Sequence, residues 1–159
     1  MGTTRFSGPI KAGDVFDTTG TTVGTIANVG SVELAQSYAL TQSGSETALA
    51  TTIVIPANST ITSIDLFVTT AWSSGTTTYT ISVGTSATAT ELAAATNANA
   101  VGRLSITPGT DATRTGLWIN VGTTDVQIYV KSGAHSVTDG VGTLVVRYIQ
   151  ALNDATPTV

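Results

Sequence analysis

The single histidine, His135, is the side chain best suited to acid–base chemistry near neutral pH. It lies in the segment Ser-Gly-Ala-His-Ser-Val-Thr-Asp-Gly, with Ser136 beside it and Asp139 four residues further on. A Ser-His-Asp triad depends on how the fold places the three groups, and the sequence contains no Gly-x-Ser-x-Gly motif to present a serine nucleophile. We therefore expect His135 to be an ordinary loop residue, and we predict no catalytic residue and no enzyme activity.

The residue types and their spacing give little support for a functional carboxylate group or a metal site. The chain has no cysteine and only one histidine, which excludes zinc–thiolate and poly-histidine metal sites. The ten acidic residues are dispersed, and only Asp14 and Asp17, in the segment Asp-Val-Phe-Asp, hint at a cation. The calcium-loop pattern and the phosphate-binding loop with its Lys-Ser/Thr are both absent. We predict no metal and no cofactor.

Three aromatic residues could stack on a sugar ring, and each also has a structural explanation. Strict alternation with its neighbours places Tyr79 in the core, and Trp72 ends a predicted strand, where aromatic residues often plug a sandwich. Trp118 is out of phase with Leu117 and Ile119, which predicts a surface position. An exposed tryptophan fits a subunit contact, because tryptophan is frequent among the residues that dominate binding energy.

The composition indicates an all-β protein. Charged residues make up 10% of the chain, against about 25% in ordinary soluble domains. Thr is abundant and suits a half-buried pleated surface, while the 16 glycines suit turns. A net charge of −4 argues against nucleic-acid binding, for which a basic face is expected. No run approaches the 18 apolar residues that a membrane-spanning helix needs, and residues 1–28 contain no signal-peptide pattern.

Residues 1–28 are predicted to form an extended N-terminal arm. They are rich in Gly and Thr, and their hydrophobic residues show no sustained period. The segment is either a disordered tail or an arm that becomes ordered on a neighbouring subunit, filling pockets with its spaced side chains. The candidate contact residues for a partner protein or a neighbouring subunit are Arg5, Phe6, Pro9, Ile10, Lys11, Phe16 and Trp118.

Residues 29–152 are predicted to form the folded domain, and residues 153–159 a loose C-terminal tail. Gly, Ser, Asn and Pro clusters separate eight predicted strands: 31–40, 49–55, 61–72, 76–85, 103–107, 117–121, 125–131 and 143–152. Residues 86–100 break the pattern, and their Ala and Leu content favours either a short helix over 90–96 or a long loop.

Short strands without alternating helices favour an antiparallel sheet over a parallel one. We therefore predict an antiparallel β-sandwich of about eight strands, for which a jelly roll is one possible form. The segments 53–55 and 144–146 are apolar on both faces of their strands. Such strands are either central in a sheet or buried against another subunit.

Several stretches resemble small structural proteins of tailed bacteriophages. They are TRFSGPIKAG at 4–13, ANVGSVELAQ at 27–36, IPANSTITSIDLFVTTAW at 55–72, TISVGT at 80–85 and GTLVVRYIQ at 142–150. Together they span nearly the whole chain. Within this group, the sequence is similar to the head decoration proteins, also called capsid cement proteins.

The resemblance implies a non-enzymatic β-sandwich protein that binds the outer surface of the mature phage head and stabilises it. The implied partners are the phage major capsid protein and further copies of the chain, as a homotrimer, with no nucleic acid and no membrane. The implied location is the outer capsid surface of the virion, after synthesis in the host cytoplasm. The alternative is a phage fibre or receptor-binding module that recognises a surface glycan through Trp118 and the loops. A third hypothesis, a glycan-active enzyme, would need paired carboxylates in a cleft.

Overall fold

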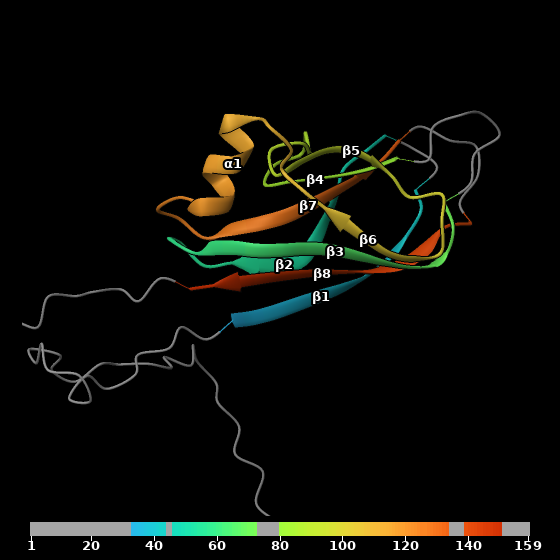
Figure 1. Ribbon diagram of the computed structural model, residues 1–159, viewed down its shortest axis with the longest axis horizontal. Coiled ribbons are helices and arrows are strands. Elements are labelled where there is room, and N and C mark those ends of the chain that lie inside the picture. Colours follow the sequence, from blue (N-terminus) through green and yellow to red (C-terminus); the bar gives the residue numbers. More distant parts are fainter. Residues whose placement is uncertain (1–32, 44–45, 73–79, 134–138, 151–159) are drawn as a thin grey trace, which may run out of the picture. The chain divides into compact units, whose positions relative to one another are not determined.

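A computed structural model describes residues 33–43, 46–72, 80–133 and 139–150 (Figure 1). The predicted arm and tail, Tyr79 and His135 lie outside these residues. The described chain forms strands β1 (Glu33–Thr41), β2 (Leu49–Ile55), β3 (Thr60–Thr70), β4 (Thr80–Gly84), β5 (Ala93–Asn97), β6 (Gly102–Ile106), β7 (Val126–Ser132) and β8 (Val141–Ile149), with one helix, α1 (Ala112–Ile119).

The strands form two antiparallel sheets, each of four strands. Sheet A has the order β1-β8-β3-β6, and sheet B has the order β2-β7-β4-β5 (Figure 1). The first strand therefore pairs with the last, the second with the last but one, the third with the sixth and the fourth with the fifth. This nested pairing is that of a long hairpin wrapped into two sheets, which is the jelly roll. The predicted antiparallel β-sandwich is confirmed.

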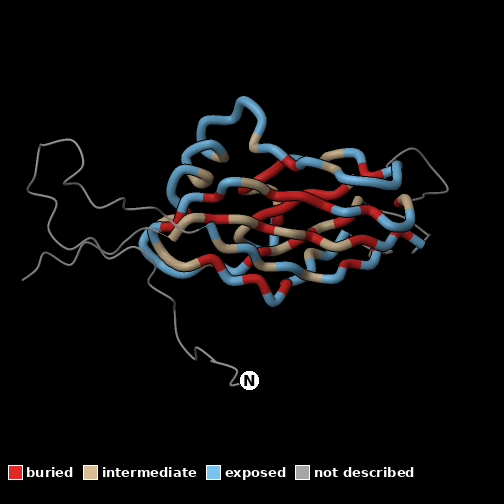
Figure 2. Tube along the Cα trace, turned by 60° about the horizontal axis from the view of Figure 1, so that its bottom comes forward, coloured by how far each residue is buried: buried red, intermediate tan, exposed pale blue. Residues whose placement is uncertain are grey.

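The core lies between the two sheets and is built by alternation along the strands. In β3, Ile64, Leu66 and Val68 are buried. In β7, Ile128 and Val130 are buried from the opposite sheet and belong to the same hydrophobic cluster. Figure 2 shows buried and exposed positions taking turns along the strands. Each sheet thus presents one face to the core and one face outward.

Trp72 follows the end of β3 and closes one end of the sandwich. Its side chain is buried, its backbone N–H donates to the Ala98 carbonyl at 3.0 Å, and its indole N–H donates to Ser132 Oγ at 3.4 Å. Gly140 packs so closely that a Cβ there would come within 2.7 Å of the indole ring. The prediction that Trp72 closes one end of a sandwich agrees with this packing.

The side chain of Gln36 links the two edge strands β1 and β2. Its Nε2 donates to the Val54 carbonyl at 2.6 Å and to the Tyr148 hydroxyl at 2.9 Å. Its Oε1 accepts from the Val54 backbone N–H at 3.1 Å. One amide therefore satisfies both backbone groups of Val54 at the side of the sandwich where sheets A and B meet.

The prediction of a helix over 90–96, or of a long loop, was wrong: the segment contains β5. Ala93 pairs with Val83, and Asn97 pairs with Thr80, so β5 completes sheet B as an edge strand. Helix propensity is a weak determinant even for Ala, the best helix former, and pairing with a buried neighbour outweighs it.

The prediction of a strand over 117–121 was also wrong, because residues 112–119 form α1. Asp111 caps the helix, its side chain accepting from the Arg114 backbone N–H at 2.9 Å. Arg114, Leu117 and Trp118 follow the i, i+3, i+4 spacing of one helix face, and all three are partly buried. The capping aspartate and this spacing were the signals that favoured a helix.

Candidate interaction surface

A buried carboxylate lies at the centre of the outer face of sheet A. Asp65 alternates with the buried residues Ile64 and Leu66 of β3, so its side chain points away from the core. Arg103 on the neighbouring strand β6 donates from Nε and Nη2 to the two carboxylate oxygens, at 2.9 and 3.1 Å. Arg147 on β8, the strand on the other side, donates from Nη1 at 2.9 Å.

Two serines complete the hydrogen bonding of this charged cluster, which we call the Asp65 cluster. Ser105 Oγ donates to Asp65 Oδ1 at 3.0 Å, and Ser63 Oγ accepts from Arg147 Nη1 at 3.1 Å. The sheet register brings the groups together, because Asp65 pairs with Ser105 and Ser63 pairs with Arg147. The cluster therefore spans the three strands β6, β3 and β8.

Burial and charge act in opposite directions on Asp65. Its side chain is 1% exposed, and burial raises the pKa of its carboxyl group. Hydrogen bonds from Arg103 and Ser105, with the charge of Arg103, lower that pKa by more, so it lies below its ordinary value. The guanidinium groups cover the carboxylate and remain open to solvent, with side chains 57% exposed for Arg103 and 35% for Arg147.

Apolar and small side chains surround the Asp65 cluster on the same face. Phe67 and Val141 are exposed, and Val145 on β8 pairs with Asp65 itself. On β1, Ala35 and Ala39 are exposed at outward positions. The outer face of an antiparallel sheet is commonly polar and solvated, so apolar side chains here are candidates for contact with another protein.

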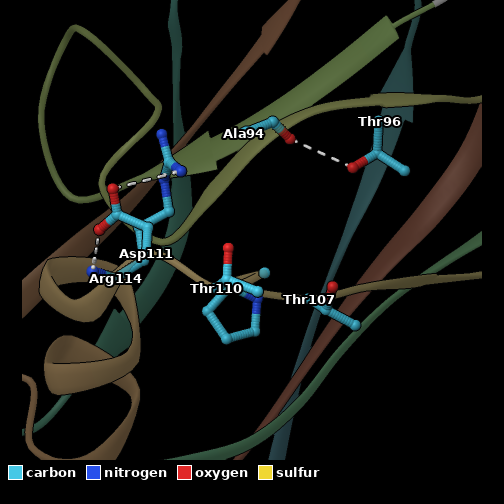
Figure 3. A pocket seen from close by; sticks show the side chains of 8 residues that line it. Ala94, Thr96, Thr107, Thr110, Asp111 and Arg114 are labelled. Carbon is cyan, nitrogen blue, oxygen red and sulfur yellow. Dashed lines mark hydrogen bonds and ion pairs between the residues drawn. The ribbon is translucent and has the colours of Figure 1, made fainter.

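A hollow of about 520 Å³ lies beside the start of α1 (Figure 3). Its lining residues come from β5 and from the segment that enters the helix: Ala94, Thr96, Thr107, Pro108, Gly109, Thr110, Asp111 and Arg114. Asp111 caps the helix, while Arg114 Nε donates to the Thr90 carbonyl at 2.9 Å. No aromatic residue lines this hollow, so it offers no stacking surface for a sugar ring.

The two tryptophans do not form a shared sugar-binding surface. Trp72 is buried in the core, whereas Trp118 is on α1, partly buried against the core cluster. The indole N–H of Trp118 donates to the Leu92 carbonyl at 2.9 Å. The other candidate contact residues, Arg5, Phe6, Pro9, Ile10, Lys11 and Phe16, lie outside the described residues. The predicted contact set as a whole stays a prediction.

Sequence reasoning missed the Asp65 cluster, although a signal was present. Asp65 and Arg147 lie in the middle of predicted strands and Arg103 begins one, in a chain with only 16 charged side chains in all. Such positions suggest paired charges. The partners could not be identified from the sequence, because pairing depends on which strands are neighbours and on their register.

Two absences hold for the described part of the chain. No group of three or more His, Asp or Glu side chains there could hold a metal ion. No helix there is long and apolar enough to cross a membrane.

Comparison with known proteins yields a likeness of fold. No protein-family model matches the sequence, and no curated protein is significantly similar to it. Among solved structures, a chain of the cyanophage Pam1 capsid asymmetric unit superposes with a TM-score of 0.58 at 16% sequence identity. The match covers 87% of this chain and 99% of the other. The two proteins therefore share a fold over nearly their whole lengths.

Proposed function

We propose, starting from the fold shared with a chain of a cyanophage capsid, that this protein is a non-enzymatic structural protein of a phage virion. In this proposal it binds the outer surface of the capsid and stabilises it, as a decoration protein does. The observation that carries the proposal is the match of fold along 99% of a chain from a capsid asymmetric unit. A match to one small part of a larger chain would carry much less weight.

The abundance of hydroxyl side chains suits a protein that stays dissolved until it binds an assembled shell. Neutral hydroxyl groups are abundant, and they cost less to remove from water than ions do. Many copies on one shell also multiply a modest contact, so each copy can bind weakly and still reinforce the shell. The jelly roll gives each copy the rigid body that a protein needs in order to reinforce a shell.

The finer parts of the proposal concern assembly. We place the protein on the outer capsid surface as a homotrimer, in contact with the major capsid protein and with its own copies. Residues 1–28 act as an arm that ties adjacent subunits together, with Arg5, Phe6, Pro9, Ile10, Lys11 and Phe16 as contacts and Trp118 as a further one. Extended segments of this kind bind through backbone hydrogen bonds and side-chain anchors.

Co-sedimentation with undecorated, expanded heads of the source phage tests the proposal. We expect saturable binding at a fixed ratio to capsid subunits, and that ratio gives the stoichiometry. Host cells serve as the parallel bait. Binding to cells without binding to heads would contradict the proposal and would favour a receptor-binding module that recognises a surface glycan.

Deletion of residues 1–20 tests the arm separately. We expect the truncated protein to keep the circular dichroism spectrum of a β-sandwich and to bind heads more weakly than the full chain. Unchanged occupancy of the heads would remove the arm from the proposal.

A further inference from the structure

We propose that the outer face of sheet A is the surface that docks on the capsid, and that Arg103 and Arg147 there bind carboxylate groups of an acidic strip on the partner. This inference rests on the proposed function. It adds which face of the sandwich is used and which chemistry the partner must present.

The guanidinium groups of Arg103 and Arg147 are held in place before any partner binds. Asp65 fixes Arg103 by two hydrogen bonds and Arg147 by one. A long cationic side chain normally loses rotamer freedom on binding, and these two have lost much of it already. Binding through them therefore costs less entropy than binding through free arginines.

Both arginines keep guanidinium N–H groups that no described residue accepts. Arg103 uses Nε and Nη2 toward Asp65, and Arg147 uses Nη1 toward Asp65 and Ser63. Among the described residues, no hydrogen bond engages Nη1 of Arg103, or Nε and Nη2 of Arg147. Guanidinium groups match the planar geometry of a carboxylate, so these free N–H groups suit an incoming Asp or Glu.

The Asp65 cluster carries a positive net charge. Two arginines around one aspartate leave the Asp65 cluster with a net charge of +1, whereas the whole chain carries −4. Glu33 also faces outward from sheet A and accepts a hydrogen bond from the Thr62 hydroxyl, so the four charged side chains described on this face sum to zero. A two-fold axis through the Asp65 cluster would place two clusters of charge +1 against each other. Charge complementarity at the cluster therefore favours an acidic group on the partner over a second copy of the cluster.

Apolar side chains surround the Asp65 cluster. Contact would bury Phe67, Val141 and Val145 around the cluster and exclude water from it, which strengthens the attraction between guanidinium and carboxylate. Four strands about 4.8 Å apart and roughly 30 Å long offer about 500 Å², somewhat less than the ~800 Å² per partner of a standard interface. One copy would bind weakly through this face, and many copies on one shell would bind well.

Co-sedimentation of full-length variants with expanded heads, repeated over a range of salt concentrations, tests the inference. Arg103→Glu reverses one charge of the cluster. Ala35→Glu adds a carboxylate at an exposed position that pairs with Arg147 and leaves the cluster itself intact, so it serves if the first variant does not fold. Lys131→Glu is the matched control, because Lys131 alternates with the buried residues of β7 and faces outward from sheet B.

We expect the wild type to bind less tightly as salt rises. Arg103→Glu and Ala35→Glu should each weaken binding at least tenfold, and Lys131→Glu should bind like the wild type. Equal binding by all folded variants would overturn the assignment of this face and leave the proposed function standing. Equal losses in all three variants, the control included, would also overturn it, because binding would then follow net charge and not a particular face. Failure of the wild type to bind heads would overturn both proposals.

Discussion

The outer faces of the two sheets are covered in different ways. On sheet B, Ser82 and Gly84 of β4 alternate with core residues and yet are buried. Gly84 lies under the β4–β5 connection, where an added Cβ would fall within 2.7 Å of both Ala89 and Thr90. On sheet A, guanidinium and hydroxyl groups of side chains cover the Asp65 carboxylate. The fold has thus closed part of one face with its own backbone and left the other face to side chains that a partner can contact.

The helix α1 also binds the β4–β5 connection. Arg114 and Trp118, one turn apart on α1, donate to the Thr90 and Leu92 carbonyls beside β5. Trp118 therefore has a structural role, whether or not it also contacts a partner.

The largest expected effect comes from breaking the cover of sheet B. Gly84→Val would place side-chain atoms against the backbone of Ala89, where even a Cβ comes within 2.6 Å of Cα. We expect a loss of about 3 kcal/mol in the free energy of unfolding, measured by urea denaturation. Gly116→Ala is the control, because nothing lies within 4 Å of its added Cβ and Ala is the better helix former by roughly 1 kcal/mol. A Gly84→Val protein as stable as the wild type would refute the close packing of the connection.

Glu91 holds the same connection together. Its carboxylate accepts from the Ser86 and Thr88 hydroxyls and from the backbone N–H groups of Thr85 and Thr90. Burial alone would raise the pKa of Glu91, but these hydrogen bonds lower it from 4.5 to about 2. Because the folded-state pKa is the lower one, the stabilisation is complete above pH 4.5 and is lost as the pH falls toward 2.

We expect Glu91→Gln to remove this part of the acid dependence, which linkage limits to about 3 kcal/mol. The check is the free energy of unfolding of both proteins from pH 2 to pH 7. Parallel curves for the two proteins would show that the carboxylate does not stabilise the connection.

Asp65→Asn tests sheet A in the same way. The change leaves two arginines around a neutral amide, and we expect the free energy of unfolding to fall by about 2 kcal/mol. Removing one partner of a buried ion pair costs more than this, but both arginines here can regain water. The pKa of Asp65 is lowered, so its contribution is present above the ordinary carboxyl range and fades below it. Urea denaturation at pH 7 and pH 3 should therefore show a smaller deficit at the lower pH. A constant deficit would contradict the role of the charge.

Trp118→Phe has the smallest expected effect. The ring remains and the Leu92 carbonyl loses its donor, so we expect a loss of about 1 kcal/mol by urea denaturation. Binding to heads provides a second readout. An unchanged stability with weaker binding would show that Trp118 serves the partner and not the attachment of α1 to the β4–β5 connection.

The strands that alternate strictly could be predicted from the sequence, because burial on one face imposes a period of two on any half-buried strand. The segment 125–131 is a case of this kind and matches β7 to within a residue at each end. The segment 49–55 matches β2 because Pro56 ends the run of β-forming residues. The pattern failed for β5 and α1. Pairing with β4 decides β5, whereas α1 is set by the Asp111 cap together with the hydrogen bonds of Arg114 and Trp118 to the segment before β5.

The candidate surface could not be predicted, although each of its residues is visible in the sequence. Asp65 and Arg147 are 82 residues apart and meet because β3 and β8 are neighbours in sheet A. Strand order is a property of the whole chain and leaves no trace in local periodicity. The apolar residues on both faces of 144–146 were the nearest hint, and Val145 does lie on the outer face beside the cluster.

The register of β1 and β8 opens a route for engineering the chain. Glu33 lies opposite Ile149, so the strand that begins the sandwich starts beside the strand that finishes it. Two antiparallel neighbours joined at that point make a β-hairpin, for which a two-residue Asn-Gly turn is suited. A circularly permuted chain, closed there and opened between the exposed residues Thr123 and Thr124, would keep every strand pair of both sheets. A cargo fused to the new termini would then be displayed from the loop after α1, at the same end of the sandwich as the closed junction.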